Sequence, residues 1–222
     1  MIGIIFDFNG TLFWDTELHY KAWREYSKQL RGTPFSDEEM YEHMSGRTNY
    51  DILKYCLNKE PEPEFCKKLS YEKEAMYRKT CLKNRELLKL APGAEEFLDF
   101  LKENNIPRTI ATMSEIENVE FYIKEFQLEK WFDIDEIVYN DNKIKGKPHP
   151  EIYQIAASRL NLKPENCVVF EDAISGIQSA FGANIGKVIA VASQEKVETY
   201  QSINGLYQII TDFYQIDKKI FQ

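Results

Sequence analysis

Residues 4–12 read IIFDFNGTL, a short apolar run that ends in an acidic residue and a turn. A run of this length, bounded by turn residues, is typical of a strand buried on both faces. Asn9-Gly10 is a common turn dipeptide and indicates where the strand ends. The sequence therefore predicts that Asp7 lies at the carboxyl end of the first strand.

The stretch from residue 15 to residue 90 has helical periodicity throughout, and no strand is needed to explain it. Gly32 is expected to end the first helix. Pro61 and Pro63 break the chain before a long polar helix that runs to about Asn84. The expected helix starts are Asp15 or Thr16, the capping box of Ser36 with Glu39, Asn49, and Pro63. This region is predicted to be all helical.

From residue 91 onwards, helical and strand patterns alternate. The expected helices are 94–104, 116–127, 149–161 and 173–183, and the expected strands are 107–112, 135–139, 166–170, 186–191 and 207–210. Such alternation predicts a parallel sheet covered by helices on both faces. We therefore predict an α/β protein with a doubly wound, Rossmann-like core formed by residues 1–14 and 91–222. Residues 15–90 would form an inserted all-helical cap domain.

Composition excludes several classes of protein. The 222-residue chain has a formal net charge of −8, which argues against a nucleic-acid binder, because such a protein needs a basic face. No apolar stretch approaches the roughly 18 residues of a membrane span. The N-terminus lacks the basic segment of a signal peptide, and four scattered cysteines fit a reducing cytoplasm. We expect a cytoplasmic protein, a monomer or weak dimer, with no nucleic-acid or membrane partner.

Polar residues follow several of the predicted strands. Right-handed crossovers bring the carboxyl ends of parallel strands to one edge of a sheet, so Asp7, Thr112, Lys147 and the pair Glu171-Asp172 should lie close together. A carboxylate can attack a phosphate ester, and a hydroxyl and an ammonium group can hold the transferring oxygens. Each piece alone is more simply a turn, cap or surface residue. Their common place at strand ends favours phosphoryl chemistry.

Nearly the whole chain resembles the haloacid dehalogenase superfamily, in the branch that contains beta-phosphoglucomutase and phosphoglycolate phosphatase. The residues that carry the resemblance are, in chain order, IIFDFNGTL, TIATMS, GKPHPEIY and VVFEDAISGIQSA. The helical stretch from 15 to 90 resembles the helical cap of this family, and DTELHYKAW and EHMSGR within it resemble segments that approach the substrate.

The resemblance implies a role for each strand-end residue. Asp7 would be the nucleophile and would carry the phosphoryl group as an aspartyl-phosphate. Thr112, which the expected strand 107–112 places at a strand end, would hydrogen-bond that group in preference to Ser114. Lys147 would shield the charge of the phosphoryl group and of Asp7.

The same resemblance implies Mg²⁺ as the cofactor. Asp7, Glu171, Asp172 and the backbone carbonyl of Asn9 would hold it, and oxygen ligands of this kind suit magnesium. The substrate would be a small phosphorylated metabolite, with sugar phosphates among the candidates. Its expected contacts are Thr11, Met113 and Ser114 of the core, and His19, Gly46 and Arg47 of the cap. For His19 a packed histidine, and for Arg47 a surface arginine, are equally good interpretations.

Asn9 departs from the family pattern, which has an aspartate that acts as general acid and base. An amide cannot exchange a proton in this role, and such help is typically worth about 10²–10⁴ in rate. Three explanations remain open: a slow or specialised enzyme with another base such as His19, a non-catalytic binder, or an engineered substitution. Dehalogenases use no metal, which disfavours them. A phosphonate-cleaving enzyme would need a cap lysine, for which Lys21 and Lys28 are weak candidates.

The sequence thus predicts a magnesium-dependent phosphatase or phosphotransferase of the haloacid dehalogenase type. The alternative is a catalytically weak homologue that binds phosphate esters, because Asn9 replaces the general acid.

Overall fold

The computed structural model of the chain describes residues 2–44, 47–141 and 143–221. The chain forms two compact units. The first consists of Met1–Trp14 with Lys89–Gln222, and the second is Asp15–Leu88. The boundary between the second unit and the rest of the first was predicted two residues later, between residues 90 and 91.

The larger unit is built on a six-stranded sheet in the order β3-β2-β1-β4-β5-β6, and all its strand pairs are parallel. The strands are β1 (Gly3–Phe6), β2 (Arg108–Glu115), β3 (Val138–Asn140), β4 (Cys167–Glu171), β5 (Lys187–Val191) and β6 (Gln208–Ile210). This order confirms the predicted doubly wound α/β core. β1 lies between β2 and β4, so its carboxyl end is flanked by the ends of both neighbours.

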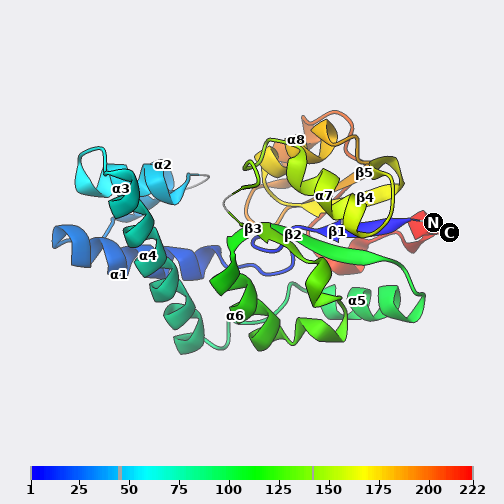
Figure 1. Cartoon of the computed structure of the whole chain (residues 1–222), viewed down its shortest axis with the longest axis horizontal. Coiled ribbons are helices and arrows are strands. Elements are labelled where there is room, and N and C mark those ends of the chain that lie inside the picture. Colours follow the sequence, from blue (N-terminus) through cyan, green and yellow to red (C-terminus); the bar gives the residue numbers. More distant parts are fainter. Residues whose placement is uncertain (1, 45–46, 142, 222) are drawn as a thin grey trace. The chain divides into compact units, whose positions relative to one another are not determined.

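Helices cover both faces of this sheet (Figure 1). They are α5 (Ala94–Glu103), α6 (Ile116–Phe126), α7 (Glu151–Arg159), α8 (Ile174–Gly182) and α9 (Val197–Gln201). Short 3₁₀ turns span η1 (Leu128–Lys130), η2 (Ile134–Glu136), η3 (Pro164–Asn166), η4 (Phe213–Gln215) and η5 (Lys218–Phe221). Helices α7 and α8 lie on one face, and α5 and α6 lie on the other (Figure 1).

Alternation along the central strands explains both layers, since successive side chains of a strand point to opposite faces. Ile5 and Val169 belong to the buried cluster that contains the apolar residues of α7 and α8. Phe6 and Phe170 point the other way and stack on each other at 5.1 Å, with Phe97 of α5 packed against both rings. Burial on both faces is why residues 4–6 form an unbroken apolar run.

Several predicted boundaries were wrong. β2 continues to Glu115 instead of ending at Thr112, because Glu115 pairs with Asn140 of β3 across a register shift. The expected strand 135–139 is a 3₁₀ turn, Ile134–Glu136, followed by the strand Val138–Asn140. Helix α9 was not predicted from the sequence.

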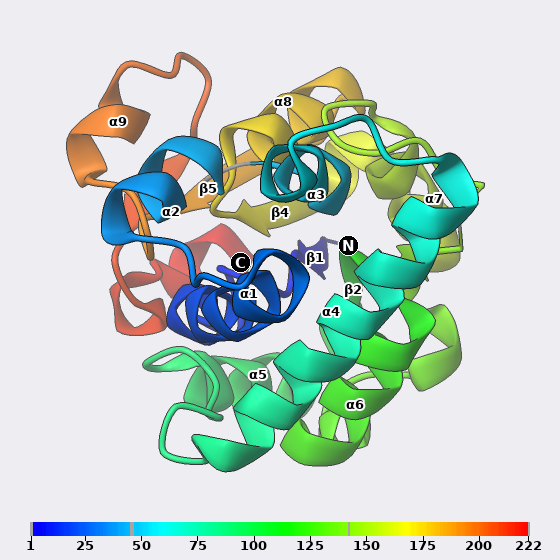
Figure 2. The same cartoon turned by 90° about the vertical axis from the view of Figure 1, so that its left-hand side faces the viewer.

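The smaller unit contains α1 (Thr16–Arg31), α2 (Asp37–His43), α3 (Asn49–Leu57) and α4 (Pro63–Lys83). Helix α1 packs against α4, with α3 in contact with both (Figure 2). Their apolar faces bury a cluster that includes Trp23, Leu53 and Leu69, together with Phe35 from the segment between α1 and α2.

Most ends of these helices follow the sequence. Gly32 ends α1 with φ 83°, in the left-handed region that suits glycine. Ser36 and Glu39 form the predicted capping box. The prediction for α3 was wrong: Thr48, and not Asn49, caps this helix, because the Thr48 side chain accepts from the backbone N–H of Asp51. Among the described residues, no helix is long and apolar enough to cross a membrane.

Candidate active site

Three carboxyl groups meet at the carboxyl edge of the sheet. Asp7 directly follows β1, Glu171 is the last residue of β4, and Asp172 comes next. Each offers one oxygen, and these oxygens all lie within 4.8 Å of one another. The side chains are buried, with 7%, 1% and 8% of their surface exposed, respectively. Such a set of oxygen atoms has the composition that magnesium prefers in proteins.

One ammonium group serves this cluster. Nζ of Lys147, from the loop that precedes α7, donates to Oδ1 of Asp7 at 2.6 Å and to Oε1 of Glu171 at 2.5 Å. Tyr153 of α7 also donates to that Glu171 oxygen, at 2.9 Å. Among the described residues, the ammonium group of Lys147 contacts two of the three carboxyl groups, and its one positive charge cannot balance all three when they are ionised.

Burial raises the pKa of Asp7 to about 7, with nearby Glu171 adding to the increase and Lys147 opposing it. Burial, and then the neighbouring carboxylates, raise the pKa of Asp172 well above its usual range. Burial alone would lower the pKa of Lys147, but the charges of Asp7 and Glu171 outweigh it and raise that pKa well above its ordinary value. Lys147 therefore stays protonated, and a cation placed near these carboxyl groups would favour their ionised forms.

Two glycines allow the backbone to approach the carboxylates closely. A Cβ atom at Gly10 would collide with Oδ2 of Asp172, and Gly10 also has φ 79°, which disfavours other residues. A Cβ atom at Gly176, in the first turn of α8, would collide with the carboxylate of Glu171. The turn after β1 and the start of α8 therefore fit around the acidic pair.

Both carboxylate oxygens of Asp172 accept hydrogen bonds. Thr11 donates to Oδ1 at 3.0 Å, and Gln194 donates from Nε2 to Oδ2 at 3.2 Å. The hydroxyl of Tyr200 donates to the backbone carbonyl of Asp172 at 2.6 Å. Asp172 is thereby held from two sides of the site.

The Asn9 side chain is held by two hydroxyl groups. Ser114 donates to Oδ1 of Asn9 at 2.8 Å, and Nδ2 of Asn9 donates to the hydroxyl of Tyr122 at 2.8 Å. Thr112 lies behind this pair, and its Oγ1 accepts from the backbone N–H of Ser114 at 3.1 Å. Because a hydroxyl can donate or accept, Ser114 and Tyr122 could both donate to a carboxylate at position 9.

Comparison with known proteins gives this arrangement a context. The sequence model of the haloacid dehalogenase-like hydrolases matches residues 2–184. The chain belongs to this family.

Individual proteins are similar to this chain in sequence or structure over most of its length. A phosphorylated carbohydrates phosphatase of Thermotoga maritima is 35% identical over 196 residues, which cover 86% of this chain and 85% of that protein. The crystal structure of a HAD hydrolase, family IA, variant 3, from Entamoeba histolytica is 43% identical, has a TM-score of 0.93, and covers 99% of this chain and 96% of its own. A beta-phosphoglucomutase from Clostridium difficile is 25% identical, with a TM-score of 0.78, and covers 100% of this chain and 96% of its own.

Several of the predicted site residues do not present a free functional group at the sheet edge. Thr11 is fully buried, and its hydroxyl is bonded to Asp172. Met113 packs against the apolar cluster under α7 and α8. Thr112 lies inside β2, so the strand-end argument for it was wrong. Its Oγ1 nevertheless accepts a hydrogen bond from the backbone N–H of Ser114.

Of the predicted cap contacts, His19 and Arg47 lie in the smaller unit, and Gly46 lies outside the described residues. Nδ1 of His19 is 2.9 Å from Nζ of the buried Lys73, its Nε2 is 3.2 Å from Oδ2 of Asp15, and its ring stacks on Tyr77 at 3.9 Å. His19 is thus a packed residue in a polar network.

Arg47 is exposed, and the two cap lysines that were considered for phosphonate cleavage are ordinary helix residues. Lys21 pairs with Glu17 at 2.9 Å, and Lys28 is exposed in the last turn of α1.

Sequence reasoning missed several polar residues: Lys73, Tyr122, Gln194 and Tyr200. Each acquires its role from a partner far away in the chain, as with Tyr122 and Asn9, which are 113 positions apart. No local pattern marks these residues, so only the fold could reveal them.

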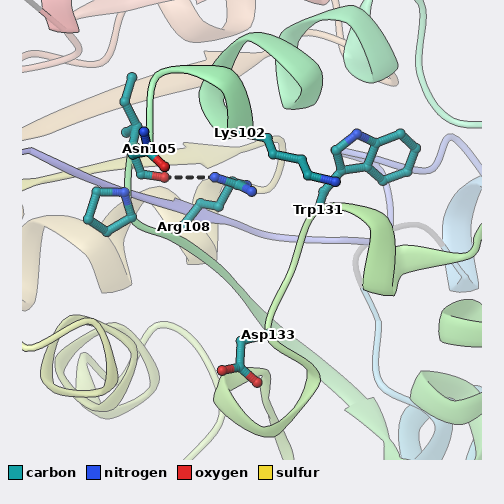
Figure 3. Close-up of a pocket in the computed structure, with 7 residues that line it drawn as sticks. Lys102, Asn105, Arg108, Trp131 and Asp133 are labelled. Atoms are coloured by element: carbon teal, nitrogen blue, oxygen red, sulfur yellow. Dashed lines mark hydrogen bonds between the residues drawn. The ribbon is translucent and has the colours of Figure 1, made fainter.

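A pocket of about 320 Å³ lies at the amino-terminal end of β2 (Figure 3). It is lined by Lys102, Asn105, Ile106, Pro107, Arg108, Trp131 and Asp133. Arg108 opens β2 and donates to the backbone carbonyl of Ile106 at 2.9 Å. Because Ser114 lies near the opposite end of the same strand, this pocket is separate from the carboxylate cluster.

Proposed function

We propose that this protein is a magnesium-dependent phosphatase of small phosphorylated carbohydrates, with Asp7 as its nucleophile. The observation that carries the proposal is the buried Asp7 carboxyl group, which is bonded to Lys147 and lies within a cluster of three carboxyl groups at the sheet edge. The name of the Thermotoga maritima relative, a phosphorylated carbohydrates phosphatase, supports this substrate class.

In the proposed reaction, an oxygen of Asp7 attacks the phosphorus of the substrate, and the bond from phosphorus to the sugar oxygen breaks. The phosphoryl group is then carried by Asp7 as an acyl phosphate. Water attacks the phosphorus in the second step, the acyl phosphate bond breaks, and phosphate leaves with the Asp7 carboxylate regenerated. The sugar oxygen takes up one proton, and the attacking water loses one.

Lys147 would offset the charge that gathers on the phosphoryl oxygens, since its ammonium group already contacts Asp7. Thr112 accepts from the backbone of Ser114, which leaves its own O–H free to donate to a phosphoryl oxygen. A magnesium ion held by Asp7, Asp172 and the backbone carbonyl of Asn9, with Glu171 beside it, would reduce the repulsion between phosphate and carboxylates.

Asn9 limits both proton transfers in this scheme. Its carboxamide cannot protonate a leaving sugar oxygen or take a proton from water. We therefore expect slow hydrolysis of sugar phosphates and a smaller handicap with esters whose leaving group is a stable anion.

A screen of phosphorylated sugars with magnesium tests the proposal by release of inorganic phosphate. Asp7→Asn should abolish the release, while Asp135→Asn, at an exposed aspartate of the same unit, should leave it unchanged. Equal activity of the Asp7→Asn protein would contradict the assignment of Asp7.

The second candidate function is binding of phosphate esters without turnover, and Asn9 is the observation that favours it. Tight binding of a sugar phosphate in calorimetry, with no phosphate released from any substrate, would support this alternative over the first.

A further inference from the structure

The segment that follows β5 contacts Asp172 at two points and the turn after β1 at one. Ser193 donates to the backbone carbonyl of Gly10, Gln194 donates to Oδ2 of Asp172 at 3.2 Å, and Tyr200 donates to the backbone carbonyl of Asp172 at 2.6 Å. This segment lies beyond residues 2–184, the part that the family model matches. The matched range therefore does not include the three donor residues.

Gln194 differs from the other two because it is exposed, while the carboxylate that it contacts is only 8% exposed. Its amide reaches from the surface to Asp172 and contributes little to the buried core. Gln194 can therefore be replaced with little effect on folding, since surface substitutions usually change stability by less than about 0.5 kcal/mol.

Gly10 makes this contact possible. A Cβ atom at position 10 would collide with Oδ2 of Asp172 and would lie 2.6 Å from Nε2 of Gln194. The turn after β1 thus leaves space in which the amide and the carboxylate meet. Thr11, the next residue, donates to the other oxygen of Asp172 at 3.0 Å. Two donors on opposite oxygens fix the rotation of the carboxylate group.

We infer that Gln194 is a positioning residue that orients Asp172 for magnesium and favours magnesium over calcium. The inference rests on the proposed function, which places the cation at Asp7 and Asp172. An amide donates a hydrogen bond without adding charge, so Gln194 directs the carboxylate and leaves the charge of the cluster unchanged. Magnesium demands near-ideal octahedral geometry, whereas calcium accepts six to eight ligands in flexible arrangements.

The orientation of Asp172 should consequently matter more for magnesium than for calcium. Loss of a hydrogen bond to a metal-binding side chain typically costs about 10–100-fold in affinity. For Gln194→Leu, which keeps the bulk but removes the donor, we expect the magnesium Kd to rise about tenfold, the low end of that range. The calcium Kd should rise by a smaller factor, so discrimination between the two cations should fall.

The test is calorimetric titration of the full chain with magnesium chloride and, separately, with calcium chloride. Gln201→Leu is the matched control, since Gln201 is an exposed glutamine at the end of α9. Circular dichroism and Tm without added cation should be equal for both variants and the parent protein. The expected result is weaker magnesium binding and a reduced preference for magnesium in Gln194→Leu alone.

Two results would overturn the inference while leaving the proposed function intact. An equal loss of affinity for magnesium and calcium would show a general electrostatic effect. Unchanged affinities would show that Gln194 has no role in positioning Asp172. If the parent protein binds no magnesium, the proposed function and this inference both fail.

Discussion

Changing Asn9 to aspartate should increase kcat if the missing general acid limits turnover. The structure supports such an exchange without rebuilding the site. Ser114 already donates to Oδ1 of Asn9, and the hydroxyl of Tyr122 can turn from accepting to donating. A carboxylate at position 9 would thus keep two hydrogen bonds, and the substitution should not impair folding.

The expected gain follows from the value of general acid catalysis, about 10²–10⁴ in rate. We expect kcat for a sugar phosphate to rise about 10²-fold in Asn9→Asp, which corresponds to about 2.7 kcal/mol of activation free energy. The gain should be smaller with p-nitrophenyl phosphate, because its leaving group needs no proton. Asn166→Asp, which adds the same charge at an exposed position of the same unit, should change neither rate.

The assay is phosphate release under saturating magnesium with both substrates. A gain below tenfold for the sugar phosphate would refute the reasoning, as would equal gains with both leaving groups. One chemical side reaction must be controlled, because asparagine followed by glycine loses ammonia slowly and takes up water to become a mixture of aspartate and isoaspartate. The backbone N–H of Gly10 is held by the carbonyl of Phe13 at 2.7 Å, and peptide mass spectrometry will measure any converted fraction in the parent protein.

Three further predictions concern charge, backbone and pH. Lys147→Met should lower kcat by about 10²–10³-fold, since a preorganised donor to the phosphoryl group is lost; phosphate release will show it, and a loss below tenfold would contradict the role of Lys147. Gly10→Ala should destabilise the protein by about 1–3 kcal/mol through its left-handed backbone alone, and the collision with Asp172 should also weaken magnesium binding; denaturant unfolding and calorimetry will measure the two effects, and an unchanged magnesium Kd would argue against that collision. Hydrogen bonds, first from Arg31 and then from the backbone N–H of Ser36, lower the pKa of Glu39 to about 2. The charged Glu39 therefore stabilises the helical unit above the ordinary glutamate pKa of about 4.3, and this stabilisation is lost as the pH falls from there towards 2. In denaturant unfolding, Glu39→Gln should be less stable than the parent at neutral pH and equally stable near pH 2, and a stability difference independent of pH would contradict this.

The sequence was a good guide to the fold where local pattern and global arrangement agree. The apolar run before Asp7 and the alternation after residue 91 were enough to predict a parallel doubly wound sheet, which the strand order confirms. The end of β2 was misjudged because its last residues are polar, and only pairing between Glu115 and Asn140 extends the strand. Asn49 was wrongly predicted to cap α3, because Thr48 and Asn49 are neighbouring residues that both favour the N-cap position, and their sequence alone does not distinguish them.

The candidate site divides in the same way. Asp7, Lys147, Glu171 and Asp172 could be predicted, because parallel strands bring their carboxyl ends together whatever the loops do. The residues that hold them could not, since Gln194 reaches Asp172 through a loop whose course no local pattern determines. The pairing of Asn9 with Tyr122 likewise depends on how α6 packs against β2 and how Tyr122 stacks on Phe8.

The most direct test of the account is chemical identification of the phosphorylated residue. The full chain would be mixed with magnesium and a sugar phosphate that it hydrolyses, quenched rapidly, and treated with borohydride, which reduces an acyl phosphate to an alcohol. We predict that peptide mass spectrometry will find position 7 converted from aspartate to homoserine, and that omitting the substrate will prevent the conversion. Reduction at another carboxylate, or turnover with no reduced residue at all, would contradict the proposal that Asp7 is the nucleophile.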